Sequence, residues 1–286
     1  MAKLDEQSSE VKTKKAKTID GIIFVLLLIG AVAMVFPLLY MVLSSFMTKN
    51  QILSANFSII PDPWKFGKYS EVLQKPEFLR GLRNTLTVAI PVLVVGAFTS
   101  SLAAFSFSKL KFKGKNGIFL GLLATMMIPT QVTMIPLFVV MNRMGLIDSY
   151  ASVILPSIFR PFAVFMLVQQ MRTIPNDFLD AARIDGANVF QIFRKVALPL
   201  CIPSLATLSI TTFMESWNDY LWPLLMLTNK NKMTLPIALS TLNGQYATEY
   251  NVLMAGSLIS MIPIILIYIV AQRQFKDGMM AGGIKG

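Results

Sequence analysis

The sequence predicts an all-α polytopic membrane protein with six transmembrane helices and a cytoplasmic helix-turn-helix between the fourth and fifth. Of its 286 residues, 54% are apolar and only 14% are charged, whereas soluble domains carry roughly 25% charged residues. The mean hydropathy is +0.60. The apolar residues also fall into several runs of about 20 residues, the length at which a helix crosses a hydrocarbon core about 30 Å thick.

Four of the predicted spans contain no charged residue, and they cover residues 21–46, 85–107, 118–141 and 251–272. Two more are interrupted. Residues 150–171 contain Arg160, and residues 198–227 are apolar only as far as Met214, before Glu215 and Asp219. The first span is longer than the roughly 7–15 residues of a signal-peptide core and lacks a small-residue cleavage site, so we expect it to remain as a helix. Prolines within or beside the spans can kink them; they are Pro37, Pro91, Pro129, Pro136, Pro161, Pro223 and Pro263.

Basic residues predict that both termini lie in the cytoplasm. The predicted cytoplasmic segments hold 16 Lys and Arg residues and the external segments hold 9, as the positive-inside rule requires. The densest cluster, Lys109 to Lys115, lies in a very short connection, where the rule has most force. The external residues 49–83 run against it with 6 basic residues. This distribution explains the formal charge of +11 without a nucleic-acid partner.

Three regions follow from this reading. Residues 1–19 are predicted to be a disordered, basic cytoplasmic tail, since they carry five lysines among Ser and Glu. Residues 20–273 form the six-helix transmembrane domain, which includes the cytoplasmic loop 174–199. Residues 274–286, which are rich in Gly, form a second cytoplasmic tail.

The composition excludes most catalytic and metal chemistry. Histidine is absent and Cys201 is the single cysteine, which removes zinc sites, haem histidines and histidine-based triads. Cys201 lies among apolar residues and is expected to pack. The chain has no phosphate-binding loop, because Gly67-Lys68 and Gly114-Lys115 lack the preceding glycine at the required distance. We therefore expect a non-catalytic protein that binds no metal and no cofactor.

The cytoplasmic loop 174–199 has the signals of two short helices joined by a sharp turn. Asn176 or Asp177 can cap the first helix, and Gly186 can supply the positive φ that ends it. Asn188 and Gln191 have the spacing of a capping box for the second helix. Such a unit could present a knob to a partner protein, or it could rest on lipid as an interfacial helix.

The same loop resembles the EAA loop of ABC importer permeases. The matching positions are Asp180-Ala181-Ala182, Gly186, Val196 and Leu198-Pro199. Asp180 stands where that family usually has Glu, so the charge is kept. The resemblance covers roughly residues 20–286 and looks like the carbohydrate-type branch, on the basis of Met127-Ile128-Pro129, Trp217-Asn218-Asp219-Tyr220 and Gln272-Arg273-Gln274-Phe275.

The resemblance implies that the loop is a coupling helix seated in a cytoplasmic ABC ATPase dimer, which binds ATP and Mg²⁺ in place of this chain. Gly186 would give the turn, Asp180 and Arg183 would offer charge, and Ala181 and Ala182 would allow close approach. It also implies a second homologous permease subunit, an extracytoplasmic solute-binding protein and a bacterial or archaeal cell membrane. The implied coupling residues are Asp180, Ala181, Ala182, Arg183, Asp185, Gly186, Val196, Leu198 and Pro199.

Candidate residues for the solute pathway cluster near the outer part of the fifth span. Aromatic rings and carboxylates suit a sugar, although Trp and Tyr also anchor helices at membrane interfaces. Glu215 and Asp219 share a helix face, and intramembrane carboxylates mark either a pathway or a charge pair. Arg160 is their expected partner. The candidates are Glu215, Trp217, Asn218, Asp219, Tyr220 and Arg160.

Three other functions remain in competition at this point. The same permease architecture can serve a different polar solute. A secondary transporter would need an intramembrane carboxylate site, for which Glu215 and Asp219 alone qualify. An intramembrane hydrolase would need paired aspartates at one depth, and Asp180 and Asp185 lie in the cytoplasmic loop instead.

Overall fold

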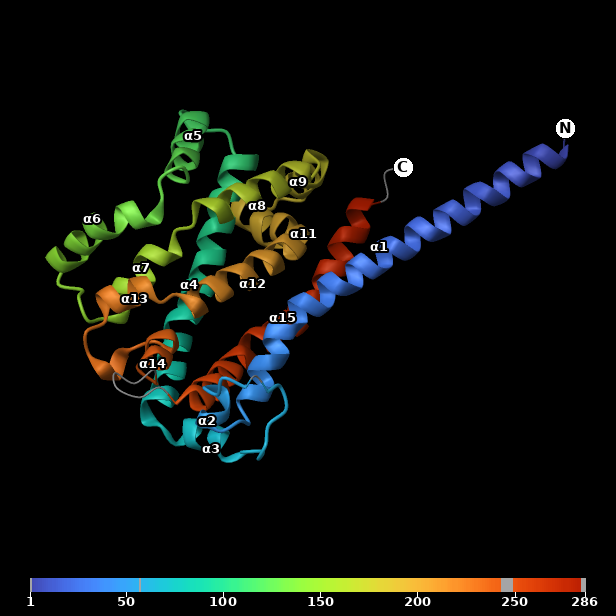
Figure 1. The fold of residues 1–286 in the computed structure, drawn as a ribbon. Helices are drawn as coiled ribbons and strands as arrows, with labels where there is room; N and C mark the ends of the chain where they lie inside the picture. Colours follow the sequence, from blue (N-terminus) through green and yellow to red (C-terminus); the bar gives the residue numbers. More distant parts are fainter. Residues whose placement is uncertain (1, 57, 243–248, 284–286) are drawn as a thin grey trace.

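The computed structural model describes residues 2–56, 58–242 and 249–283, and within these ranges every regular element is a helix (Figure 1). The first half of the chain forms α1 (Ala2–Ser44), α2 (Lys49–Ile52), α3 (Gly67–Gln74), α4 (Pro76–Lys109), α5 (Lys115–Thr125), α6 (Thr130–Arg143) and α7 (Tyr150–Ile158). The second half forms α8 (Pro161–Thr173), α9 (Asn176–Ile184), α10 (Val189–Ile192), the π-helical turn η1 (Phe193–Ala197), α11 (Leu198–Leu200), α12 (Ile202–Asn218), α13 (Leu221–Met226), the 3₁₀ turn η2 (Lys230–Lys232), α14 (Leu235–Leu242) and α15 (Tyr250–Gly283).

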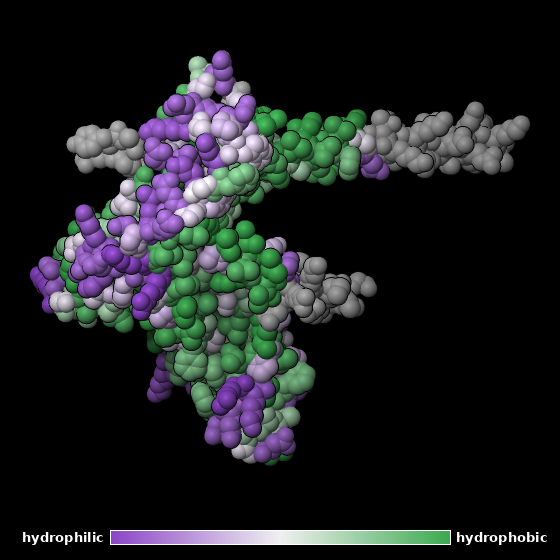
Figure 2. Space-filling view, turned by 90° about the horizontal axis from the view of Figure 1, so that it is seen from below, coloured by the Kyte–Doolittle hydropathy of each residue, from purple (hydrophilic) through white to green (hydrophobic). Residues whose placement is uncertain are grey.

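Between four and six helical segments can cross a membrane. Four qualify as they stand, and they are Ile19–Ser44, Pro76–Lys109, Tyr150–Thr173 and Tyr250–Val270. Two further candidates are bent pairs, α5 with α6 at 101° and Val189–Leu200 with α12 at 78°. The structure thus shows a polytopic, all-helical chain in the ranges described. Figure 2 shows hydrophobic side chains over the middle of one face and hydrophilic side chains gathered in patches at its margins.

Prolines explain where the predicted spans are broken. The predicted third span, 118–141, is not one straight helix, because the chain leaves helical geometry before Pro129. The fourth breaks at Phe159 and Arg160, immediately before Pro161. Proline lacks an N–H and disfavours helical geometry at the preceding residue. The fifth predicted span bends at Cys201, between Pro199 and Pro203, and its helix ends at Asn218.

Helix α1 runs without interruption from Ala2 to Ser44, so residues 2–19 of the predicted basic tail continue the helix of the first span. No Gly or Pro precedes Gly21, so the helix of the span can extend backwards through Ala, Lys, Glu and Gln, which are good helix formers. The side chains of the most hydrophobic stretch of α1 are exposed, although the lower half of α1 runs beside α15 in Figure 1. Its helical contacts are made with α15.

The predicted carboxyl-terminal tail, 274–286, is helical as far as Gly283, because α15 continues through it. Its last three residues, Ile284, Lys285 and Gly286, lie outside the described residues.

Helix α4 is the centre of the fold and packs against α7, α8, α12 and α14. Two of its glycines allow close approach. A Cβ on Gly81 would lie 2.8 Å from the Cβ of Ala238, and a Cβ on Gly96 would lie 3.2 Å from the carbonyl oxygen of Ile158. The second contact places α4 against the end of α7, next to the break that carries Arg160.

The two ends of α4 define two ends of the molecule. In Figure 1, α2, α3 and α14 surround its first residues, whereas α5 and α9 lie near its last residues. At the first end, Asn84 donates to the carbonyl oxygens of Asn231 and Met233 and accepts from the hydroxyl of Tyr150. At the other end, the Nζ of Lys109 donates to the carbonyl oxygen of Ile174 at 2.6 Å. The predicted external and cytoplasmic loops therefore separate to opposite ends.

Candidate functional site

The segment from Pro175 to Leu200 begins with a helix that no side chain caps. Pro175 occupies the N-cap position, and neither Asn176 nor Asp177 caps α9 as predicted. The reason is that α9 starts at Asn176 itself, one position too early for either side chain to reach back to the free N–H groups. The Oδ1 atom of Asn176 accepts from Lys109 instead, at 3.1 Å.

The predicted turn at Gly186 is present. Its φ is +81°, its N–H donates to the carbonyl oxygen of Arg183 at 3.0 Å, and the N–H of Ala187 donates to that of Ala182 at 2.9 Å. These two bonds form a Schellman motif, which ends a helix at a left-handed residue. Nothing lies within 4 Å of the position that a Cβ on Gly186 would take. The glycine is therefore needed for its backbone conformation, not for space.

The predicted capping box is also present. The N–H of Gln191 donates to Oδ1 of Asn188 at 2.9 Å, and the N–H of Asn188 donates to Oε1 of Gln191 at 2.8 Å. The second helix then passes through the π-helical turn η1 into α11. Helix, turn and helix follow one another as the sequence predicts.

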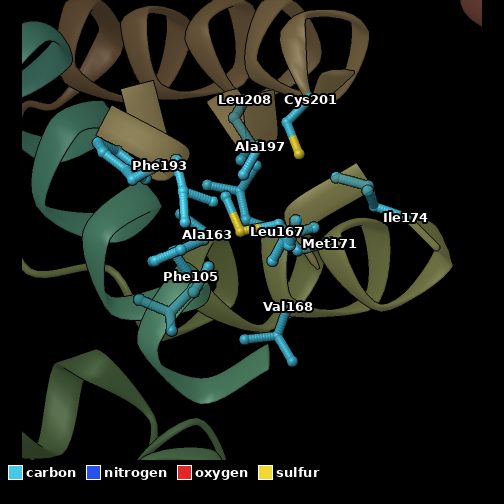
Figure 3. Close-up of a cluster of buried hydrophobic side chains, with 14 residues drawn as sticks. Phe105, Ala163, Leu167, Val168, Met171, Ile174, Phe193, Ala197, Cys201 and Leu208 are labelled. Carbon is cyan, nitrogen blue, oxygen red and sulfur yellow. The ribbon is translucent and has the colours of Figure 1, made fainter. Parts of the chain in front are cut away.

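The inner side of this segment is packed into the core. Leu179, Ile192, Phe193 and Ala197 are all at most 2% exposed. They join a cluster that also contains the side chains of α4, α8 and α12 shown in Figure 3. Figure 3 shows Phe193 and Ala197 close to Ala163 and Leu167 of α8, with Phe105 of α4 beside them. The inner side of the segment is therefore packed directly against α4, α8 and α12.

The outer side of the segment carries apolar side chains that are more than half exposed in the described part of the chain. Phe178, Ile184, Val189 and Phe190 are 56%, 87%, 52% and 54% exposed. They lie at the end of the molecule that also carries the charged loop 109–115. Exposed apolar clusters rimmed by polar groups mark interaction sites.

The other predicted coupling residues divide between these two sides. Ala181, Asp185 and Pro199 are exposed, and Ala182, Val196 and Leu198 are half-buried. Asp180 and Arg183 pair with each other, with Oδ1 and Nη1 2.6 Å apart, and both remain more than half exposed. An exposed pair of this kind contributes little stability, so both groups stay available to another surface.

The second candidate site is a cavity of about 860 Å³ between the bent pair α5–α6, the broken helix α7–α8 and α12. Its wall is mainly apolar and carries six hydroxyl side chains and three charged ones. The hydroxyl residues are Thr125, Thr130, Thr133, Ser157, Thr211 and Thr212, and the charged residues are Arg160, Glu215 and Asp219.

The charge pair that the sequence predicts is formed. Nη2 of Arg160 lies 2.6 Å from Oε2 of Glu215. Arg160 occupies the break between α7 and α8, and Glu215 lies on α12, so the pair joins the fourth and fifth predicted spans. Asp219 also lines the cavity, and its Oδ1 accepts from the N–H of Trp222 at 3.4 Å.

The other three pathway candidates do not line this cavity. Trp217 is 2% exposed, stacks on Phe213 and donates its indole N–H to the carbonyl oxygen of Ser260 at 3.1 Å. Its ring is thus used in packing α12 against α15 and has no free face for a solute. Asn218 bonds to the carbonyl oxygen of Met214 one turn earlier. Tyr220 is 36% exposed but lies outside the cavity wall.

Sequence reasoning missed the hydroxyl residues of the cavity. Thr211 precedes Glu215 by four residues and therefore shares its helix face. That spacing could have identified Thr211 from the sequence as a neighbour of Glu215. The residues of α5, α6 and α7 have no such signal, because only the bends at Pro129 and Pro161 bring them to one wall.

These features define the membrane-spanning subunit of a transport system, with a cavity between broken helices and an exposed helical turn at one end. Residues 93–280 match the family of binding-protein-dependent transport system inner membrane components, and the chain belongs to this family.

Two relatives and one solved structure illustrate the likeness. The arabinooligosaccharides transport system permease protein of Halalkalibacterium halodurans is 37% identical, over 88% of this chain and 91% of that protein. The sn-glycerol-3-phosphate transport system permease protein of Pectobacterium atrosepticum is 30% identical, over 90% and 94%. A chain of a bacterial ABC transporter involved in the import of the acidic polysaccharide alginate has a TM-score of 0.81 and 26% identity, covering 91% of this chain and 98% of that chain.

Proposed function

We propose that this chain is a non-catalytic permease subunit of an ABC importer and forms part of the pathway for a saccharide. A second homologous permease completes the pathway, an extracytoplasmic binding protein delivers the solute, and a cytoplasmic ATPase dimer binds ATP and Mg²⁺. Each bent pair counts as one crossing, which gives six spans with both termini in the cytoplasm. Family membership and the chemistry of the two candidate sites support this assignment.

A saccharide fits the wall of the cavity. Neutral and charged oxygen groups from three helical units surround a space of about 860 Å³, and such polar groups fix the orientation of a hydroxylated ligand. Relatives named for arabinooligosaccharides and for lactose support a sugar. The relative named for sn-glycerol-3-phosphate keeps a different polar solute as the alternative.

The main support for binding to an ATPase is the exposed apolar surface on the outer side of the segment 175–200. Its inner side is fixed to α4, α8 and α12, so a force applied to its outer side reaches the membrane helices directly. We propose that Phe178, Ile184, Val189 and Phe190 enter a groove of the ATPase. In this proposal the segment acts as the coupling helix, and Gly186 sets the angle between α9 and α10.

The test is to purify the chain from its own membranes and measure the amount of ATPase that accompanies it and the uptake of sugar. Ile184→Asp should abolish both, because it places a charge in the contact without disturbing the core; Ile184 is 87% exposed. Ile60→Asp is the matched control, since Ile60 is 69% exposed at the opposite end. It should leave both measurements unchanged.

Gly186→Ala provides a second variant with its own control. It should weaken ATPase retention because an L-residue at positive φ costs about 1 kcal/mol and redirects the turn. Gly145→Ala has the same backbone cost, since Gly145 also has a positive φ and open space around it, but it lies between α6 and α7. A chain that purifies alone and transports sugar without ATP would overturn the proposal and favour a secondary transporter.

A further inference from the structure

The charged groups of the cavity do not balance. Arg160 is the only cation among the lining residues of the described chain, and Glu215 already neutralises it at 2.6 Å. Asp219 remains as a second carboxylate. The wall therefore carries a formal excess of one negative charge, next to low-dielectric surroundings that strengthen its field.

The hydroxyl groups of the wall also favour hydrogen-bond donors over acceptors. Thr125, Thr133, Ser157 and Thr211 each donate their hydroxyl hydrogen to a carbonyl oxygen of their own helix, at 2.6, 2.9, 2.8 and 3.1 Å. Back-bonding of this kind uses the donor and leaves the oxygen lone pairs free. These four side chains therefore present acceptors to the cavity.

A negatively charged wall that is rich in hydrogen-bond acceptors suits solutes that donate hydrogen bonds. The hydroxyl groups of a neutral sugar can donate to the threonine and serine oxygens and to the carboxylates, which form the stronger, charge-assisted bonds. A uronate or a phosphate ester brings acceptors and negative charge, and the charge of its one cationic partner among the described lining residues, Arg160, is already neutralised by Glu215.

We propose that Arg160, Glu215 and Asp219 make this half of the pathway a filter that admits neutral, hydroxyl-rich solutes and rejects acidic ones. The inference rests on the proposed function and deepens it, because it names the class of saccharide. Likeness alone does not decide this class, since relatives are named for neutral sugars, for a phosphate ester and for an acidic polysaccharide.

The field in the cavity can be measured without any sugar. Thr211→Cys places a thiol on the cavity wall, one turn before Glu215, in an exposed position. Cys201, which is fully buried, is replaced by Ala so that the introduced thiol is the only one in the chain. The assembled importer is reconstituted in liposomes, and the thiol reacts with a cationic and an anionic methanethiosulfonate reagent of similar size.

The ratio of the cationic to the anionic rate, divided by the same ratio for free cysteine, reports the sign of the local charge. We expect a value above one with the native charges. Glu215→Gln should lower it by roughly threefold or more, and Arg160→Gln should raise it by a similar factor, because each changes the wall by one unit of charge in opposite directions. Glu71→Gln is the matched control. Glu71 pairs with Lys68 on α3, outside the cavity, and should change nothing.

A second measurement connects the charge to the solute. Arabinotriose and a galacturonic acid trimer are tested for protection of the introduced thiol against an uncharged reagent. The neutral trimer should protect with the native charges, and the acidic trimer should protect only after Glu215→Gln.

A normalised ratio of one or less with the native charges, or the same ratio in all variants, would overturn the filter. So would equal protection by both trimers in every variant, while leaving the proposed function in place. A charge-dependent ratio without protection or uptake of either sugar would instead overturn the proposed saccharide function, and the saccharide class with it.

Discussion

At the scale of single residues, Lys109 holds together two parts of the chain that are distant in sequence. It ends α4, and its Nζ donates to the carbonyl oxygen of Ile174 and to Oδ1 of Asn176, at 2.6 and 3.1 Å. Those two acceptors lie where α8 ends and α9 begins. One side chain therefore joins the central membrane helix to the start of the segment 175–200.

Lys109→Met should loosen the start of α9. Hydrogen bonds from a charged donor contribute about 1.5–3 kcal/mol, so the amides of residues 174–180 should exchange with solvent at least about tenfold faster. Hydrogen–deuterium exchange followed by mass spectrometry measures this. Lys111→Met is the control, because Lys111 is exposed and its side chain forms no hydrogen bond within the described part of the chain. Equal exchange in both variants would contradict the role of Lys109.

Prediction at the level of residues succeeded where the chemistry left few choices. Arg160 is the one basic residue inside a predicted span, and its costly charge needs a carboxylate nearby. The sequence therefore predicted a pairing with Glu215 or Asp219, and the structure shows the pair with Glu215. Trp217 shows the limit. An aromatic side chain can cover a sugar or pack a helix, and its sequence position is the same in both cases. Only the position of α15, which supplies the carbonyl oxygen of Ser260, decides between them.

At the scale of elements, the close approach of α4 and α14 at Gly81 leaves no room for a side chain. A Cβ there would lie 2.8 Å from the Cβ of Ala238 and 3.1 Å from the Cα of Leu235. Gly81→Ala should therefore destabilise the protein by about 1–3 kcal/mol through overpacking.

Gly117→Ala, also within a helix, should have the opposite effect on stability. Gly117 lies in α5 with nothing within 4 Å of its Cβ position, so alanine should stabilise by up to about 1 kcal/mol. Thermal unfolding of the purified protein in detergent compares the two. If both variants melt alike, the contact between α4 and α14 is looser than the structure has it.

The elements themselves were largely predictable, and their shapes were not. Apolar runs located the regions that form the spans, because the number of residues needed to cross a bilayer is fixed. Whether a proline bends a helix or breaks it depends on what its neighbours can do for the freed backbone groups. Pro91 lies inside the continuous α4, whereas Pro129 lies in the break where the chain bends by 101° between α5 and α6. Sequence alone does not distinguish them.

At the scale of the whole molecule, the two ends of α4 should face opposite compartments. Lys111→Cys and Lys230→Cys place single thiols at the two ends, both in exposed positions and with Cys201 replaced by Ala. A membrane-impermeant maleimide should label intact cells only through the change at Lys230. The change at Lys111 should label only after the membrane is opened. The reverse pattern would place the segment 175–200 outside the cell and exclude a cytoplasmic ATPase as its partner.

The ion pair between Arg160 and Glu215 also affects how the fourth and fifth spans enter the membrane. Arg160 is synthesised and enters the membrane before its carboxylate exists, because 54 residues separate the two. An unpaired arginine in a membrane costs about 2.5–3.5 kcal/mol, so the helical break that carries it is poorly held in lipid until α12 arrives. We therefore expect the fourth span to be held in the membrane more firmly once the fifth has been inserted and Glu215 can pair with Arg160.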